Sequence, residues 1–293
     1  MVPGLVVVGV DGSASGLAAT EQAAREARWR RAELRVVHAF VLPAPFARSA
    51  SSTGLPESEL RGAAEQHVDE AVERARAVAP GVAVHPVVID AEPVTVLEAQ
   101  SRGADLVVAG SGGRGGLAGL LTGSKAVHLA AHGACPVLVV REASQADGPV
   151  VLGVDGSVTG AKAVDFAFTE AALRKAPLVA LHCWTVWSPT APAPPAASGS
   201  PVDPSEALAE RAEILLREAL ADARERYPGV TVRGEAVHGG TREALIRASR
   251  SAQLVVVGAR GRGGFAGLLL GSVSQAVLHH AHCPVAVVRG MHP

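Results

Sequence analysis

The chain's 293 residues exceed one ordinary domain of roughly 100–200 residues, and its 48% hydrophobic and 19% charged residues are typical of globular proteins rather than disordered ones. The net charge of −1 disfavours a general nucleic-acid binder, and an aromatic content of 3% leaves few rings for base stacking. No apolar run reaches the ~20 residues of a membrane-spanning helix, the N-terminal residues do not resemble a signal peptide, and three cysteines without a close pair favour a reducing cytoplasm.

The first half of the chain alternates Val-rich runs with helical patterns. Continuous apolar runs predict strands at 5–10, 34–41, 82–89, 105–110 and 136–140, and helical patterns cover 16–32 and 57–79. Uninterrupted apolar strands with helices between them indicate a parallel sheet that is covered on both faces. The sequence therefore predicts a doubly wound five-stranded α/β domain, in which a ligand binds outside the carboxyl ends of the strands where the strand order reverses.

The second half repeats the first. "LVVVGVDGSASG" returns as "VVLGVDGSVTG" at an offset of 144, and "ACPVLVVR" returns as "HCPVAVVR" at an offset of 148. We expect two tandem domains, 1–143 and 150–293, joined by a linker at 144–149, with the four extra residues in the Pro/Ala/Ser run at 188–204. A second amphipathic helix at 205–227 corresponds to the one at 57–79.

Two glycine clusters follow the fourth predicted strand of each repeat. Gly110-x-x-Gly113 and Gly123-Ser124 in the first repeat correspond to Gly258-x-x-Gly261 and Gly271-Ser272 in the second, with nine residues between the clusters in both. Bare amides of glycine and the N-terminus of a helix attract anions, so this spacing favours a bound polyphosphate. The alternative is that these glycines only form tight turns and helix caps. The sequence fits neither the P-loop nor the dinucleotide fingerprint.

These motifs, with "VGVDGS" after the first strand and "VVHAF" or "ALHCW" on the second, resemble the ATP-binding class of the universal stress protein family over nearly the whole chain, twice. The resemblance implies Asp11 and Asp155 near ribose and phosphates, with Mg2+ where a carboxylate meets phosphate, and Ala39 and Cys183 at the adenine. Asp-Gly as a mere turn is the alternative for the two aspartates. The nucleotide-site residues implied are Gly9, Asp11, Ala39, Gly110, Ser111, Gly112, Gly113, Arg114, Gly115, Gly123 and Ser124 in the first repeat, and Gly153, Asp155, Cys183, Gly258, Ala259, Arg260, Gly261, Arg262, Gly263, Gly271, Ser272 and Val273 in the second.

The resemblance also implies a function and an assembly. We expect an ATP-binding stress-response module with two ATP sites per chain, whose repeats pair as a pseudo-twofold through their final strands, and further dimerisation through exposed strand edges. One alternative is a slow ATPase or a self-phosphorylating protein with Ser124 or Ser272 as acceptor. Another is a structural or interaction protein whose loops hold no nucleotide.

Histidine and cysteine also gather after the last helix of each repeat, in "HLAAHGAC" and "HHAHC". A metal site is the less favoured interpretation, because histidine is common at a helix C-terminus. Cys135 and Cys283 are expected to be small buried side chains, and His38 and His182 to be hydrogen-bonded histidines at the core or its rim rather than catalytic groups. No nucleophile elbow, paired carboxylates or kinase motif is present.

Overall fold

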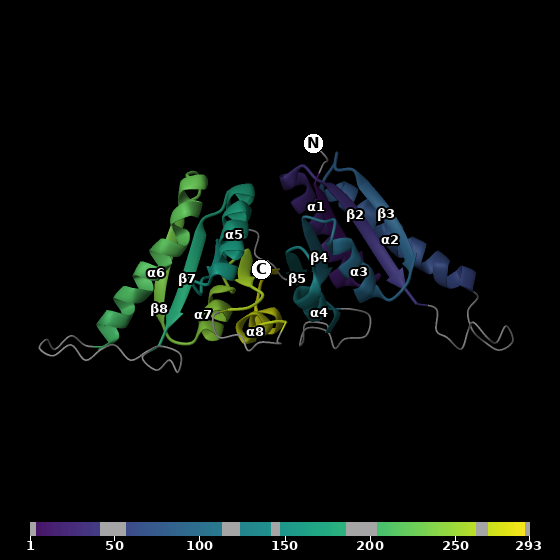
Figure 1. Cartoon of the computed structure of the whole chain (residues 1–293). Helices are drawn as coiled ribbons and strands as arrows, with labels where there is room; N and C mark the ends of the chain where they lie inside the picture. Colours follow the sequence, from purple (N-terminus) through teal and green to yellow (C-terminus); the bar gives the residue numbers. More distant parts are fainter. Residues whose placement is uncertain are drawn as a thin grey trace, which may run out of the picture. The chain divides into compact units, whose positions relative to one another are not determined.

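The structure is a computed structural model, and it describes residues 4–41, 57–112, 124–141, 147–185, 204–261 and 269–290 (Figure 1). The chain divides into two compact units, unit 1 with residues 1–142 and unit 2 with residues 143–293. Each unit is an α/β domain with a parallel sheet, so the predicted fold class is confirmed within each of them. The predicted insertion at 188–204 lies outside the described residues except for its last residue.

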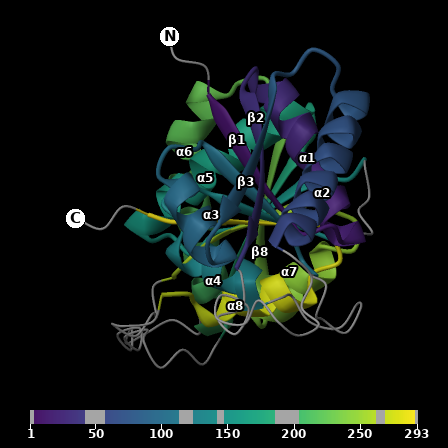
Figure 2. The same ribbon diagram turned by 90° about the vertical axis from the view of Figure 1, so that its right-hand side faces the viewer.

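Unit 1 contains five strands in the order β3-β2-β1-β4-β5, and the neighbours in this order pair in parallel. Helices α1 and α2 pack together, as do α3 and α4, and Figure 2 shows α1 and α2 on one side of the strands and α3 on the other. The bounds are β1 Leu5–Val10, α1 Ala14–Arg30, β2 Glu33–Phe40, α2 Glu57–Val78, β3 Val84–Asp90, α3 Pro93–Ser101, β4 Leu106–Gly110, α4 Ser124–His132 and β5 Val137–Val140.

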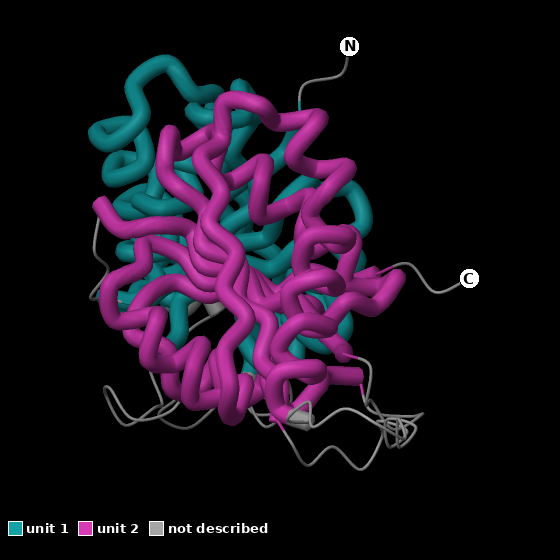
Figure 3. Tube along the Cα trace, turned by 90° about the vertical axis from the view of Figure 1, so that its left-hand side faces the viewer, with its two compact units in different colours: residues 1–142 teal, residues 143–293 magenta. Residues whose placement is uncertain are grey.

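Unit 2, magenta in Figure 3, repeats this plan with the strand order β10-β9-β6-β7-β8, and the neighbours in this order again pair in parallel. Helix α5 packs on α6, and α7 packs on α8. The bounds are β6 Val150–Gly153, a single 3-10 turn Val158–Gly160, α5 Ala161–Arg174, β7 Leu178–Trp184, α6 Pro204–Arg226, β8 Val232–His238, α7 Thr241–Ala248, β9 Leu254–Gly258, α8 Ser272–His280 and β10 Val285–Val288.

The last two strands of each unit are the most completely buried ones. β4, β5, β9 and β10 are buried along almost their whole length, which explains why their sequences are continuous apolar runs rather than alternating ones. Of the helices that the structure describes, none combines the length and the apolar character needed to cross a membrane. The sequence analysis did not predict the short helices α3 and α7, because they are too short to show a helical periodicity. The start of α3 has local signals: Pro93 lies in the first turn, and the Glu92 side chain accepts a hydrogen bond from the Thr95 amide.

Candidate functional site

In each unit the strand order reverses next to the first strand. β1 lies between β2 and β4, and β6 lies between β7 and β9, so the loops that follow β1 and β4, or β6 and β9, leave the same edge of the sheet. At such a point the connections that follow the two neighbouring strands go to opposite faces of the sheet, and this leaves a crevice at the carboxyl ends of the strands. The predicted aspartates lie at this edge, as do those residues of the predicted glycine clusters that the structure describes.

The Asp-Gly-Ser loop has the same conformation in the two units. Oδ1 of Asp11 accepts hydrogen bonds from the Ser13 amide (3.1 Å) and hydroxyl (2.5 Å), and Oδ1 of Asp155 accepts from the Ser157 amide (2.9 Å) and hydroxyl (2.8 Å). The intervening glycines have positive φ angles, +73° at Gly12 and +68° at Gly156. A residue with a side chain would be strained in this backbone conformation. The turn-forming role of the aspartates is therefore present, and it engages one oxygen of each carboxylate.

In unit 2 the two glycine clusters come together through one carbonyl group. The Ala259 carbonyl oxygen accepts hydrogen bonds from the Gly271 amide (2.7 Å) and from the Ser274 hydroxyl (2.9 Å). Gly271 is the N-cap residue of α8 and has no side chain to cap the helix, and the free amides of a helix N-terminus are a favourable place for an anion. The loop after β9 and the start of α8 are thus adjacent, as a polyphosphate cradle requires.

The aspartate of unit 2 lies against this cradle. A Cβ atom added to Gly261 would be only 3.1 Å from Oδ2 of Asp155, a tight contact, so the loop passes close to this carboxylate. Arg260 and Val273 are half-buried beside the same loops, and Ser272 begins α8. The remaining predicted residues of this cluster, Arg262 and Gly263, lie outside the described residues.

Unit 1 joins the corresponding loops by another contact. The Ser15 hydroxyl, at the start of α1, donates to the Gly112 carbonyl oxygen over 2.9 Å. A Cβ atom on Gly110 would come within 2.7 Å of the Ser15 carbonyl oxygen, and Ser111 continues β4 with its amide donating to Val140. Ser124 is the first residue of α4. The other members of the cluster lie outside the described residues: Gly113, Arg114, Gly115 and Gly123.

Gly9 and Gly153 face the helices on the other side of the sheet. A Cβ atom on Gly9 would be 2.7 Å from Leu97 of α3, and one on Gly153 would be 3.1 Å from Leu245 of α7. At these two predicted site residues the missing side chain makes room for a leucine of a packed helix. This packing is a sufficient reason for glycine at both positions, and no bound ligand is needed to explain it.

The second strand of each unit ends near the Asp-Gly-Ser loop. Ala39 and Cys183 are half-buried on β2 and β7. Burial raises the pKa of the Cys183 thiol, against a hydrogen bond from Thr241 and the charge of Arg247, so its reactive thiolate is disfavoured. His182 places Nδ1 2.8 Å from the Val154 carbonyl oxygen, which supports the prediction of a hydrogen-bonded rather than a catalytic histidine.

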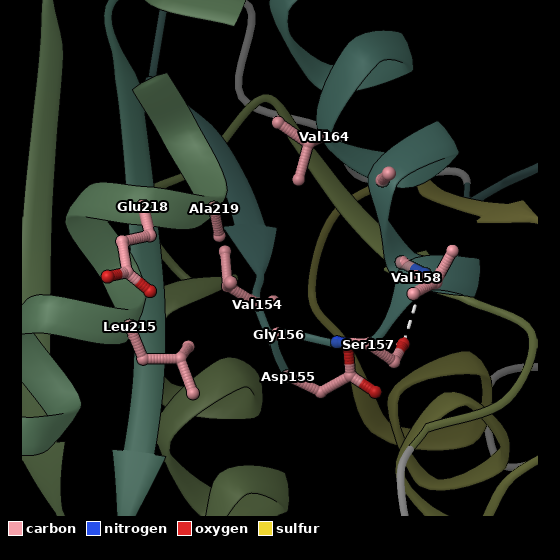
Figure 4. A pocket seen from close by; sticks show the side chains of 12 residues that line it. Val154, Asp155, Gly156, Ser157, Val158, Val164, Leu215, Glu218 and Ala219 are labelled. Atoms are coloured by element: carbon pink, nitrogen blue, oxygen red, sulfur yellow. Dashed lines mark hydrogen bonds between the residues drawn. The ribbon is translucent and has the colours of Figure 1, made fainter. Parts of the chain in front are cut away.

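A hollow of about 270 Å3 opens beside the loop of unit 2 (Figure 4). Residues 153–158 line it from one side, and Leu215, Glu218 and Ala219 of α6 line it from the other. Sequence analysis identified the loop but missed the α6 residues. The amphipathic pattern of α6 predicts which face of the helix covers the sheet. It does not predict which turns of the helix lie opposite Asp155, because that depends on how the helix is placed across the sheet.

In unit 1 a side chain lies against the corresponding turn. His67 of α2 matches Leu215 at the offset of 148 that relates the ends of α2 and α6. Its ring lies so close to Gly12 that a Cβ atom on this glycine would overlap with His67 Cδ2. The ring also stacks on His38 of β2, with 5.5 Å between centroids and 30° between planes, and its Nδ1 contacts the Ala63 carbonyl oxygen. The two candidate sites therefore differ at this position, although their Asp-Gly-Ser turns have the same conformation.

The cysteines of the last strands are unsuited to chemistry. Cys135 and Cys283 are buried, as expected from the sequence. Burial raises the pKa of the Cys135 thiol to about 12. A thiol with this pKa carries almost no thiolate at neutral pH, so it does not act as a nucleophile.

Comparison with known proteins gives one consistent answer. A model of the universal stress protein family matches residues 5–141 and 148–289. Universal stress protein Rv2623 of Mycobacterium tuberculosis (strain ATCC 25618 / H37Rv) is 36% identical over 302 residues, which cover 97% of this chain and 96% of that protein. The crystal structure of a universal stress protein from Archaeoglobus fulgidus DSM 4304 has a TM-score of 0.66 at 19% identity and covers 98% of this chain and 96% of its own. A universal stress protein in complex with cAMP is 28% identical and covers 49% of this chain and 100% of its own, with a TM-score of 0.36.

Proposed function

The chain belongs to the universal stress protein family, and we propose that it binds ATP at the carboxyl edge of each sheet and serves as a nucleotide-dependent stress-response module. The observation that carries the proposal is the meeting of three elements in unit 2: Asp155, the loop at Gly258–Gly261 and the N-terminus of α8. Bare amides and a helix N-terminus attract the phosphates, and the adjacent hollow offers space for the nucleoside.

A carboxylate beside phosphates is favourable only where it binds hydroxyl groups or a cation. Oδ1 of Asp155 accepts two hydrogen bonds from Ser157, and Oδ2 points toward the glycine loop. A hard oxygen donor at this position fits Mg2+, which prefers one or two carboxylates together with phosphate oxygens. We therefore propose ATP with Mg2+, where the ion would neutralise phosphate charge and Asp155 would orient it.

Such a module acts as a switch only if ATP binds two conformations of the protein with different affinity. ATP shifts a conformational equilibrium only if it binds two states with different affinity. In unit 1 the ring of His67 lies against Gly12, where unit 2 has its hollow, and we propose that a nucleotide displaces this ring when it binds. We propose that the two sites of one chain consequently bind ATP with different affinity. We also propose domains at 1–143 and 150–293, a cytoplasmic location and a homodimer; the pseudo-twofold pairing of the repeats stays a prediction.

Isothermal titration of the full chain with ATP and Mg2+, beside mass spectrometry of the denatured purified protein, tests the proposal. We expect up to two equivalents of ATP, and Gly261→Val should remove the tighter one because the new side chain would collide with Asp155. Gly229→Ala is the matched control, since a Cβ atom there has no neighbour within 4 Å. cAMP in a parallel titration has the same adenine but no phosphate tail, so it should bind more weakly.

Two results would contradict the proposal. Lack of ATP uptake by the wild-type protein would favour the structural alternative, and equal affinity for ATP and cAMP would show that the glycine loops do not hold a phosphate tail. The enzymatic alternative makes a separate prediction: multiple-turnover ATP hydrolysis that disappears in Asp11→Asn or Asp155→Asn.

A further inference from the structure

Three side chains with metal-binding atoms meet in unit 1, away from the loops at the carboxyl edge. Glu98 comes from α3, and His128 and His132 come from successive turns of α4. One ligand atom from each lies within 4.8 Å of the other two. His128 Nε2 is 2.8 Å from Glu98 Oε1, and His132 Nδ1 is 4.0 Å from the same oxygen. Sequence analysis considered the two histidines with Cys135 and missed the glutamate thirty residues earlier.

Cys135 takes no part in this cluster. Its thiol is buried and directed to the Pro136 carbonyl group. The cluster is instead a two-histidine, one-carboxylate set, which is a common set of ligands for Zn2+ and related divalent ions. Ligands about 2.0–2.2 Å from a tetrahedral ion lie about 3.4 Å apart, and the three ligand atoms lie within 4.8 Å of one another, so side-chain movements of up to about 1.4 Å would bring them to these distances.

The positions of the three residues are fixed by the backbone and by hydrogen bonds. Histidines four residues apart on a helix project from one face, and the two rings stack with centroids 3.9 Å apart. His132 Nδ1, the atom 4.0 Å from Glu98 Oε1, also lies 3.0 Å from the His128 carbonyl oxygen, so binding an ion through Nδ1 would require the ring to leave this carbonyl group. Glu98 Oε1 is shielded from solvent and, among the described residues, accepts no hydrogen bond of regular geometry, so the histidines and an ion are its available partners.

A buried serine holds the two helices in register. The Ser101 hydroxyl donates to the Glu98 carbonyl oxygen (2.6 Å) and accepts from the Ala134 amide just after α4 (2.9 Å). The turn that carries Glu98 is therefore tied to the end of the helix that carries the histidines. Preorganisation of this kind lowers the entropy that binding an ion would cost.

We propose that Glu98, His128 and His132 form a site for a divalent transition-metal ion such as Zn2+, with water as the remaining ligand. The proposal is independent of nucleotide binding, since none of the three residues lies in the loops assigned to ATP. The ligands are partly exposed at the surface of unit 1, which allows exchange of the ion with solvent. The site would respond to the supply of the metal.

Unit 2 has the same scaffold without the ligands. The Ser249 hydroxyl donates to the Ile246 carbonyl oxygen (2.7 Å) and accepts from the His282 amide (2.9 Å), as Ser101 does in unit 1. At the offset of 148, Ile246 and Ala276 stand where unit 1 has Glu98 and His128, and His280 alone is retained. Unit 2 is thus a matched control within the same chain.

Titration of the full chain with Zn2+ against a chromophoric chelator, without nucleotide, tests the proposal, and Co2+ absorption reports the coordination number. We expect one tight Zn2+ per chain. Glu98→Gln and His128→Ala should each weaken it about 100-fold, since loss of an orienting partner alone costs 10–100-fold. His280→Ala, in unit 2, should leave it unchanged. Far-ultraviolet circular dichroism checks that each variant is folded.

A gain of binding complements these losses. Ile246→Glu combined with Ala276→His should create a second Zn2+ site with His280, because Ser249 already fixes the two helices. The proposal is overturned if Zn2+ affinity survives both Glu98→Gln and His128→Ala. It is also overturned if His280→Ala removes the tight ion, which would place binding at the histidines of unit 2, or if the wild-type chain binds Zn2+ only weakly and without fixed stoichiometry.

Discussion

Replacement of His67 by leucine should raise the ATP affinity of unit 1 toward that of unit 2. The reason is that Leu215, the counterpart of His67, lines an open hollow, whereas the His67 ring rests against Gly12. In the wild-type protein a nucleotide entering unit 1 has to displace this ring. His67→Leu removes the ring and keeps an apolar side chain on the face of α2 that covers the sheet.

The size of the effect follows from the contacts that the ring would lose. Stacking on His38 is worth about 0.5–1.5 kcal/mol, and the hydrogen bond to the Ala63 carbonyl group about 0.5–1.5 kcal/mol. Together these contacts oppose binding by about 1–3 kcal/mol. Since about 1.4 kcal/mol is tenfold in affinity, unit 1 should bind ATP about 5- to 150-fold more weakly than unit 2.

Isothermal titration with ATP and Mg2+ measures both sites in one experiment. The wild-type curve should need two affinities, His67→Leu should bring these two affinities closer together, and Leu215→His should weaken the tighter site by a similar factor. Gln66→Leu is the control, because Gln66 is exposed on the same helix and one residue away. Equal affinities in the wild-type chain, or a Leu215→His variant that keeps its tight site, would refute the idea that this side chain gates access.

Two further predictions concern the buried interior. Glu170→Ala should lower the free energy of unfolding of unit 2, measured in urea, by about 3–5 kcal/mol, because it leaves Arg174 without its carboxylate partner, and the Arg174 side chain is only 4% exposed. Glu21→Ala is the control: it removes only exposed ion pairs and should lower the free energy of unfolding by about 1 kcal/mol or less, so equal costs of the two substitutions would contradict this prediction. The pKa of the Cys135 thiol is raised from 9.0 to about 12, so at pH 8 its thiolate fraction is about 1,000-fold lower than in the unfolded chain. A thiolate-directed reagent should therefore label Cys135 and the buried Cys283 only when urea unfolds the protein. Peptide mapping that finds Cys135 labelled in the native protein would contradict this prediction.

Much of the architecture could be predicted because it is encoded in short stretches. Val-rich runs indicated the strands, and the observed bounds of β1 at Leu5–Val10 and β4 at Leu106–Gly110 differ from the expected ones by at most a residue. The repeat made the second unit a copy of the first. The Asp-Gly-Ser turn and the start of α8 at Ser272 also follow from local chemistry, since turns and helix starts depend on a few neighbouring residues.

The differences between the two units were decided by tertiary structure. Whether a helix residue covers a loop or leaves it open depends on how α2 and α6 lie across their sheets, and the sequence alone does not show that His67 meets Gly12. The approach of Glu98 to His128 likewise needs two helices brought together by strands between them. Sequence patterns repeat within a few residues and so specify turns, helices and strands, whereas contacts between distant residues depend on the register and packing of whole elements, which no single stretch contains.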